Sequence, residues 1–204
     1  VVAERVEPEQ VHIFVYDYNS ESVEERRLTE IKECFRYKDS NRISWINIDG
    51  IRKSDVETIS AHFNIHSLLA EDILSMGQRP KMDEVEGVLY CLLNMLYYND
   101  EKKTVETEQI SIVLGTDFVI SFQEDASRDV FDPLRNKLNI ARSQIRQRTA
   151  DYLLYAMLDM IVDNYFLVME KLGEQIEMVE EEVVRSSNTR SLAKINQLRK
   201  ELIV

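Results

Sequence analysis

The feature that most constrains this chain is a long helical segment in its C-terminal third. Residues 149–185 contain no proline and only one glycine. If Thr149 caps this segment, the helix continues to about Arg185, which is roughly 35 residues or 50 Å at about 1.5 Å per residue. A helix of that length outgrows a small domain, so part of it must project from the domain or pack on a partner. Residues 186–188 are expected to end it, and another helix is expected to start near Thr189.

The part of the chain before this helix mixes strand and helix patterns. Runs of strand-type residues predict strands at 12–18, 44–48, 81–86, 88–98, 105–114 and 118–123, with 29–37 as a further candidate. The polar stretch 19–27 is expected to be a loop. Because the last four runs are joined by short connections, we expect them to be antiparallel. Together with the earlier elements, they indicate one mixed sheet covered by helices.

Two short helices are expected between these strands. Residues 54–57 have the spacing of a capping box and predict a helix over 55–63. Ser67 is expected to cap a second helix, whose core face would be formed by Leu69, Ile73 and Met76. Gly77 and Pro80 are expected to end that helix, since the residue before a proline resists helical angles.

The composition excludes some partners and favours others. A formal charge of −12 and a pI near 4.8 argue against nucleic acid, because binding phosphates requires a surplus of Lys and Arg on one face. Cations are therefore plausible partners. The two cysteines, Cys34 and Cys91, have bulky neighbours and lie far apart, which fits buried reduced thiols better than a disulfide or a zinc site.

No run of apolar residues approaches the roughly 18 to 20 that a membrane helix requires. The best candidate, Val88 to Tyr98, is about half that length and contains Asn94. We therefore expect no segment of this chain to span a bilayer. The chain begins without Met and stops inside a helical pattern, as a fragment of a longer protein would.

The acid pair Glu71-Asp72 interrupts the apolar helix predicted after His66. On a helical wheel Glu71 points away from the core face, whereas Asp72 lies at its border, where an uncompensated carboxylate would be partly desolvated. One explanation is an ion pair with Arg79, or with Arg128 or Arg135 across the fold. The other is a hard-cation site that Asp72 shares with Glu71 and an aspartate of the long helix. Oxygen ligands without thiols or clustered imidazoles suit Mg²⁺ or Ca²⁺ rather than zinc.

An acidic stripe follows one face of the long helix. Its members fall within about 60° of one another on the helical wheel. They are Asp159, Asp163, Glu170, Glu174, Glu177 and Glu181. The lower carboxylates are best explained as a solvated face. Asp159 and Asp163 sit inside an apolar run, so they are either buried and hydrogen-bonded or directed at a metal ion.

Signals of enzymatic activity are weak. The chain has no P-loop, no G-x-G-x-x-G, no G-x-S-x-G and only five glycines. His12, His62 and His66 have no metal-ligand spacing, and surface or capping roles suit them better. We therefore expect that this chain is not an enzyme.

A succession of segments resembles a known family. The segments are WINIDG (45–50), H-x-L-x-x-EDIL (66–74), QRPK (78–81), ISIVLGTDFVISFQE (110–124), VFDPLR (130–135) and ADYLLYAMLDMIVDNYF (150–166). In this order and spacing they are similar to the N-terminal cytoplasmic domain of CorA-type magnesium/cobalt transport proteins. No single motif decides the match, but the series covers most of the chain.

The resemblance implies a fold and a function. The fold is an α/β/α sandwich with a mixed, partly antiparallel central sheet, followed by long helices that lead to a truncated stalk. In the family this domain lies on the cytoplasmic side of the cell membrane as the funnel of a homopentamer, and Mg²⁺ bound between subunits keeps the pore shut. The family's ligands match Glu71, Asp72 and Asp159 here, with Co²⁺ or Ca²⁺ as alternatives to Mg²⁺ at the same sites.

The resemblance also sets the expected organisation. It predicts a cytoplasmic domain at 1–148, a long acidic helix at 149–186 that packs on it and projects, and the start of the stalk helix at 187–204. Two departures stand out: Ser67 replaces the usual proline after the histidine, and the membrane helices with their Gly-Met-Asn signature are absent. The rival functions are a zinc-transporting relative of the same fold and a soluble acidic metal-binding protein with no link to a membrane.

Overall fold

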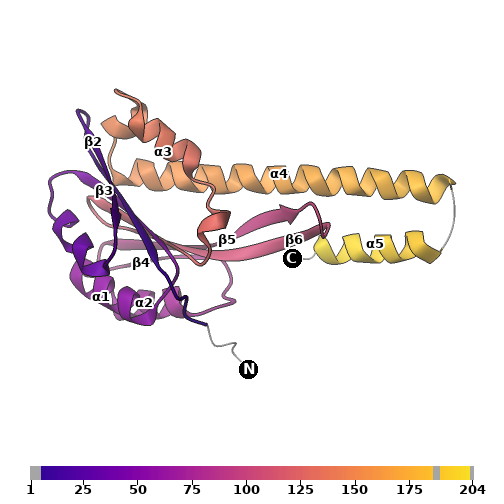
Figure 1. The fold of residues 1–204 in the computed structure, drawn as a ribbon, viewed down its shortest axis with the longest axis horizontal. Helices are drawn as coiled ribbons and strands as arrows, with labels where there is room; N and C mark the ends of the chain where they lie inside the picture. The colour runs from indigo at the N-terminus through magenta and orange to yellow at the C-terminus, as the bar shows by residue number, and fades with distance from the viewer. Residues whose placement is uncertain (1–5, 186–188, 203–204) are drawn as a thin grey trace. The chain divides into compact units, whose positions relative to one another are not determined.

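The computed structural model describes residues 6–185 and 189–202. Its centre is a seven-stranded mixed sheet with the order β2-β1-β3-β7-β6-β5-β4 (Figure 1). The strands are β1 (His12–Tyr18), β2 (Val23–Leu28), β3 (Ile43–Asp49), β4 (Lys81–Val85), β5 (Val88–Asn99), β6 (Thr104–Leu114) and β7 (Phe118–Gln123). The chain divides into two compact units: residues 1–94 with 108–160, and residues 95–107 with 161–204.

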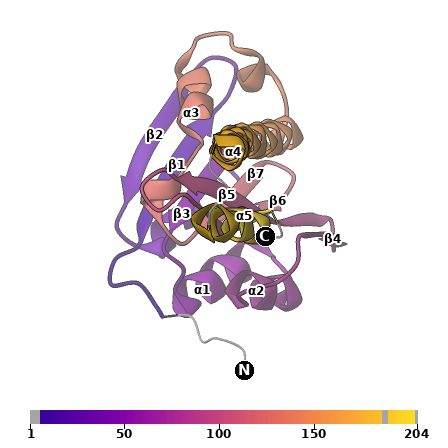
Figure 2. The same ribbon diagram turned by 90° about the vertical axis from the view of Figure 1, so that its right-hand side faces the viewer.

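The first unit is a sheet covered by helices on both faces. Figure 2 shows α1 (Lys53–Phe63) and α2 (Ser67–Leu74) on one face of the sheet, with α3 (Asp132–Asn139) and the first turns of α4 (Ala150–Arg185) on the other. The predicted mixed sheet and its helical layers are therefore confirmed. Among its described residues the unit also contains three short 3-10 helices, namely η1 (Ile31–Tyr37), η2 (Ala126–Arg128) and η3 (Gln144–Gln147).

Strand β3 lies at the centre of this sheet and is buried along nearly its whole length. It pairs antiparallel with β1 and parallel with β7. Ile46 and Ile48 belong to the core that includes α1 and α2, whereas Trp45 meets Phe131 edge-on at the start of α3. A strand covered on both faces must be apolar on both, which explains the near-continuous burial of β3.

The strand predictions are confirmed from β3 onwards and for β1, but the segment between β1 and β3 was predicted incorrectly. Residues 19–27, expected as a loop, contain the edge strand β2. Residues 29–37, the candidate strand, contain η1 instead. The Glu33 carboxylate accepts the backbone N–H groups of Thr29 and Glu30, both at 2.9 Å, which closes the helical turn. These hydrogen bonds also lower the pKa of Glu33.

The helix starts also differ from the sequence predictions. The capping box expected at 54–57 is absent, because α1 already begins at Lys53, whose N–H donates to the Glu7 carboxylate at 2.9 Å. His66, rather than Ser67, caps α2, and its Nδ1 accepts the N–H of Leu68 at 3.2 Å. Leu69 and Ile73 form the buried face of α2 as predicted, but Met76 lies beyond the helix and is exposed.

The second unit consists of the far ends of β5 and β6, the rest of α4, and α5 (Thr189–Glu201). The Asn164 amide donates to the Leu96 carbonyl at 2.5 Å, and Glu201 accepts the N–H of Val105 at 2.6 Å. The long helix has 36 residues, as its lack of breakers predicts, and α5 begins at Thr189. The break expected at 186–188 lies outside the described residues.

Helix α4 carries the most apolar long segment of the described chain. By length and composition alone, 150–183 passes the test for a membrane-crossing helix. The expectation that Val88 to Tyr98 is the best candidate was wrong, because those residues form β5. The core helix of a globular domain passes the same test, and Leu153 and Met157 of α4 are buried.

Candidate functional site

Asp72 lies at the border of the buried face of α2, and it has a partner within the chain. Lys81 Nζ lies 2.6 Å from Asp72 Oδ2, and Gln78 donates to Oδ1 at 3.2 Å. The Asp72 side chain is 22% exposed, so solvent still reaches the carboxylate. The bond to Asp72 raises the pKa of Lys81. The prediction that Asp72 needs compensation is thus consistent with the structure.

The predicted arginine partners of Asp72 are wrong. Arg79 is exposed, and Arg128 lies 3.6 Å from Asp125 instead. Arg135 pairs with Asp129 at 2.5 Å. The partner comes from the start of β4, directly after the turn that leaves α2. In that turn Gly77 has a φ of 69°, a left-handed conformation that glycine adopts without strain.

The other two predicted site residues, Glu71 and Asp159, are exposed. Glu71 points to solvent, as its place on the helical wheel predicts. For Asp159 and Asp163 the alternative of a buried, hydrogen-bonded carboxylate is wrong, because both side chains are exposed although they interrupt an apolar run. The metal-facing alternative remains open for both.

The sheet separates Asp72 from Asp159. Helix α2 covers one face of the sheet, and the first turns of α4, which carry Asp159, cover the opposite face (Figures 1 and 2). Over the described ranges 6–185 and 189–202, no group of three or more His, Cys, Asp or Glu side chains could hold a metal ion. Glu71, Asp72 and Asp159 therefore do not form one metal centre within a single chain.

The lower acidic stripe of α4 faces outward. Glu170, Glu174, Glu177 and Glu181 are all exposed in the chain. Lys171 lies 3.3 Å from Glu174, and this bond raises the pKa of Lys171. Because both partners are about half exposed or more, the pair contributes little to stability.

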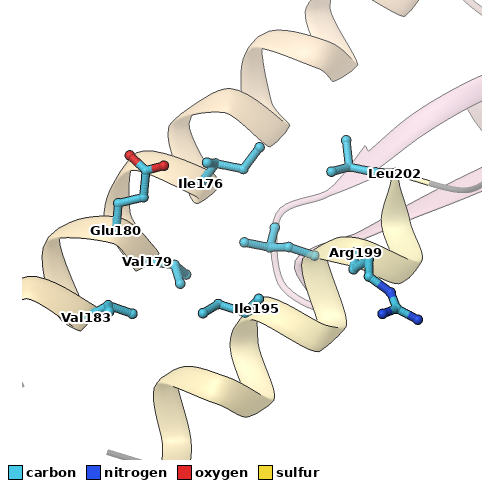
Figure 3. Close-up of a pocket in the computed structure, with 8 residues that line it drawn as sticks. Ile176, Val179, Glu180, Val183, Ile195, Arg199 and Leu202 are labelled. Atoms are coloured by element: carbon cyan, nitrogen blue, oxygen red, sulfur yellow. The ribbon is translucent and has the colours of Figure 1, made fainter. Parts of the chain in front are cut away.

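An apolar groove runs between α4 and α5 within the second unit (Figure 3). Its volume is about 650 Å³. The side chains that line it are Ile176, Val179, Glu180 and Val183 from α4 and Ile195, Leu198, Arg199 and Leu202 from α5. Figure 3 shows the aliphatic side chains of the two helices directed toward the space between them.

A buried polar cluster on the α3 face of the sheet was not predicted from the sequence. Trp45 Nε1 donates to Ser121 Oγ at 3.0 Å, and Ser121 donates to Asn47 Oδ1 at 2.6 Å. Asn47 Nδ2 in turn donates to Asp49 Oδ1 at 3.0 Å. The polar alternation in WINIDG was the available signal, since Asn47 and Asp49 must share a face of β3.

Arg135 and Asp129 provide the charged part of this cluster. The guanidinium donates to both Asp129 oxygens, at 2.9 and 2.5 Å, and lies 5.2 Å from the centre of the Trp45 ring. Burial acts to lower the pKa of Arg135, but the bonds to Asp129 outweigh it and raise the pKa. Asp129 also accepts the N–H of Phe131 at 2.7 Å, which orders the start of α3.

Asp49 is the least compensated carboxylate in the cluster. It is only 4% exposed. Burial is the largest cause that raises its pKa to about 6, and the negative charge of Asp129 adds to it. The hydrogen bond from Asn47 and the charge of Arg135 oppose the rise, and Glu108 adds a smaller increase.

The comparison with known sequences decides the family. A family model described as the CorA-like Mg2+ transporter protein matches residues 40–204. The chain belongs to this family. The cobalt/magnesium transport protein CorA of Thermotoga maritima is 37% identical over 196 residues, covering 96% of this chain and 56% of that protein. The magnesium transporter ALR2 of Saccharomyces cerevisiae is 22% identical and covers 72% of this chain and 17% of that protein.

The CorA-like assignment agrees with the fold. The soluble domain of CorA from Methanocaldococcus jannaschii superposes with a TM-score of 0.68 at 17% identity, over 98% of this chain and 74% of that one. The ZntB cytoplasmic domain from Vibrio parahaemolyticus gives a TM-score of 0.58 at 13% identity, over 92% and 74%. Both likenesses confirm the predicted α/β class with a long helix after the sheet. The chain spans about half the length of the bacterial relatives it matches and 16–17% of the length of the yeast ones.

Proposed function

We propose that this chain is the cytoplasmic Mg²⁺-sensing domain of a homopentameric divalent-cation channel, in which Mg²⁺ bound between subunits keeps the pore shut. Glu71, Asp72 and Asp159 are the proposed ligands. The observation that carries the proposal is the exposure of Asp159 and Glu71, together with the separation of Asp72 and Asp159 by the sheet of a single chain. Such a pair can share an ion only when a second copy brings the two faces together.

The charge of these carboxylates supplies the switching energy. Two carboxylates about 7 Å apart across an interface repel by about 2 kcal/mol at an effective dielectric near 20, and less where salt reaches them. Cyclic symmetry repeats this repulsion at every interface. Mg²⁺ replaces the repulsion with attraction, and because it sheds water reluctantly, it binds through few direct ligands. Loss of Mg²⁺ therefore loosens the subunits and favours the open pore.

Lys81 is expected to set the affinity of the proposed site for Mg²⁺. In the single chain its ammonium group occupies one oxygen of Asp72 at 2.6 Å. A divalent ion at Asp72 would compete with that ammonium, so the lysine lowers the affinity for Mg²⁺. Low affinity suits a sensor of an abundant ion, since a tight site would stay occupied at every physiological concentration.

The first test removes the proposed ligands in the full-length protein. Mg²⁺ should protect the wild-type assembly from limited proteolysis at millimolar concentration. Asp72→Ala and Asp159→Ala should each shift the protective concentration upward about tenfold, the equivalent of about 1.4 kcal/mol. Asp117→Ala, an exposed aspartate in the β6–β7 turn, is the matched control. Unchanged protection in both site variants would show that these residues do not hold the ion.

The second test removes the Lys81 ammonium group, which competes with Mg²⁺ for Asp72. Lys81→Met keeps the aliphatic stem but leaves Asp72 without its ammonium partner. The concentration of Mg²⁺ that protects the assembly should therefore fall severalfold. Lys53→Met, at an exposed lysine on α1, should leave it unchanged. A Lys81→Met protein that needs more Mg²⁺ would contradict the role given to Asp72.

A second candidate is zinc transport by the same fold, which the structural likeness to the ZntB cytoplasmic domain favours. The proteolysis assay with Zn²⁺, Co²⁺, Ca²⁺ and Mg²⁺ separates the two. Protection by micromolar Zn²⁺ together with indifference to millimolar Mg²⁺ would select the zinc-transporting relative.

A further inference from the structure

The carboxyl ends of β3 and β7 form a topological switch point. The two strands are parallel neighbours, and Asp49 is the register partner of Gln123 at their ends. The chain leaves β3 for α1 on one face of the sheet and leaves β7 for α3 on the other (Figure 2). In open α/β sheets, binding sites form where consecutive connections diverge in this way.

Gln123 is buried at this point without a partner. Its side chain has no exposed surface, and within the described part of the chain neither its amide oxygen nor its amide nitrogen has a hydrogen-bond partner. Leaving a buried amide unpaired is costly, so such a group signals a ligand or a proton that the heavy atoms alone do not reveal. Because register partners share a face of the sheet, the Gln123 amide lies on the same side as the Asp49 carboxyl.

The charges around Asp49 leave a negative excess. The groups that influence it are Asp129 in the loop before α3, Glu108 on β6 and Arg135 on α3. On β1, its register partner is His12, whose ring contacts Arg27 at 3.0 Å. Arg135 is already engaged by Asp129. Burial, Asp129 and Glu108 therefore raise the pKa of Asp49, whereas the hydrogen bond from Asn47 and the charge of Arg135 oppose the rise.

Glu108 does not relieve the excess at Asp49. Its Oε1 accepts the N–H groups of Glu124 at 2.6 Å and Asp125 at 2.8 Å, so this oxygen is already engaged by the backbone. A divalent metal is also disfavoured, since the described residues contain no group of three His, Cys, Asp or Glu side chains that could hold one. A proton is therefore the species that can neutralise the Asp49 carboxylate.

We propose that Asp49 and Gln123 form a proton-binding site at the carboxyl ends of β3 and β7, in which the protonated Asp49 carboxyl donates a hydrogen bond to Gln123 Oε1. The Asp49 oxygen that accepts from Asn47 keeps that bond in both protonation states. Proton uptake removes a buried charge beside Asp129 and gives the unpaired amide oxygen of Gln123 a donor in one step. Protonation of this site at mildly acidic pH therefore stabilises the packing at the centre of the sheet.

The sign of the pH effect follows from the direction of the shift. Burial and Asp129 raise the pKa of Asp49 from 3.8 to about 6 in the folded chain. The stabilisation by the bound proton is complete below the ordinary pKa of an aspartate and is lost as pH rises through about 6. Other carboxylates with lowered pKa values, such as Asp125 and Glu33, act in the opposite direction, so the contribution of Asp49 must be isolated.

Nuclear magnetic resonance on the wild-type chain, without divalent ions, tests the site directly. The Asp49 carboxyl carbon should titrate with a midpoint near 6, and the Gln123 side-chain amide signals should move with the same midpoint. A midpoint below about 4.5, within the ordinary range for aspartate, would overturn the proposal. So would Gln123 signals that do not respond to the titration of Asp49.

A variant provides an independent measurement. Asp49→Asn carries a neutral donor in place of the protonated carboxyl, so its unfolding constant at pH 7.5 should be about a hundredfold smaller than that of the wild type. The difference should shrink to roughly severalfold at pH 4.5. Asp117→Asn, at an exposed aspartate, should show no such pH-dependent difference. The proposal would be contradicted if the ratio of the wild-type unfolding constant to that of Asp49→Asn were the same at both pH values. That outcome does not depend on the result for Mg²⁺ at Asp72.

Discussion

The two units of this chain bury their apolar side chains very differently. In the first unit, the sheet is covered on both faces, and residues such as Trp45, Ile46 and Phe122 have no exposed surface. In the second unit, many large apolar side chains are exposed. They are Val162, Phe166, Leu167, Met169, Met178, Val183, Ile195 and Leu202. A covered sheet can bury both faces of each strand within one chain, whereas a pair of helices buries only the facing stripe of each helix. The free energy of folding is therefore concentrated in the first unit.

The largest expected effect compares one aromatic residue from each unit. Trp45→Ala removes a fully buried ring that contacts Tyr16 and Phe131, and it should lower the free energy of unfolding by about 3 to 5 kcal/mol. Phe166→Ala truncates a ring that is 59% exposed, and it should change that energy by about 0.5 kcal/mol or less. Urea denaturation followed by circular dichroism measures both. Equal losses would show that the exposed face of α4 is covered in solution.

The next effect compares one ion pair from each unit. Arg135→Met deprives the largely buried Asp129 of its guanidinium and should cost about 3 kcal/mol, because an uncompensated charge remains where little solvent reaches it. Lys171→Met breaks a surface pair with Glu174 and should cost less than about 0.5 kcal/mol. Adding 1 M NaCl to the wild type should leave the first contribution largely intact, because salt screens buried pairs weakly. An Arg135→Met protein as stable as the wild type would contradict the expectation that the ion pair of the first unit contributes more stability than that of the second.

The smallest effect lies inside the second unit. Glu201 on α5 accepts the N–H of Val105 on β6 at 2.6 Å. Glu201→Gln should weaken this contact by about 1 kcal/mol, seen as faster hydrogen exchange at Val105 with little change in global stability. Lys200→Gln, at the neighbouring exposed position, should leave that exchange rate unchanged. Unaltered exchange in Glu201→Gln would mean that the contact does not hold α5 against the hairpin.

The fold was predictable where local pattern and burial agree. The strands from β4 to β7 alternate or run apolar between turn residues, so they were identified almost to the residue. Strand β2 was missed because it is an edge strand with the sequence VEERRL, and solvent-exposed charges there replace the apolar alternation. The N-cap of α2 was misplaced by one residue, since a histidine ring performs the role usually given to serine.

The candidate site was predictable only in part. The helical wheel correctly indicated that Asp72 needs a partner, but it contains no information about the turn after the helix. That turn brings Lys81, nine residues later in sequence, to the carboxylate. For Asp159, apolar neighbours suggested burial, yet a helix that leaves a core exposes apolar and acidic residues alike. Whether these carboxylates meet across subunits depends on a second chain, and no pattern within one sequence encodes that geometry.

The parallel pairing of β3 with β7 has a consequence for how the protein is made. Trp45 on β3 bonds to Ser121 on β7, a residue 76 positions later in the chain. During synthesis from the N-terminus, the apolar β3 is therefore complete long before the neighbour that covers one of its edges has left the ribosome. Until then β1 is its only strand partner among the described strands, and its other edge can pair with a foreign strand. The centre of the sheet therefore stays open until most of the first unit has been synthesised, and it needs protection while the chain is growing.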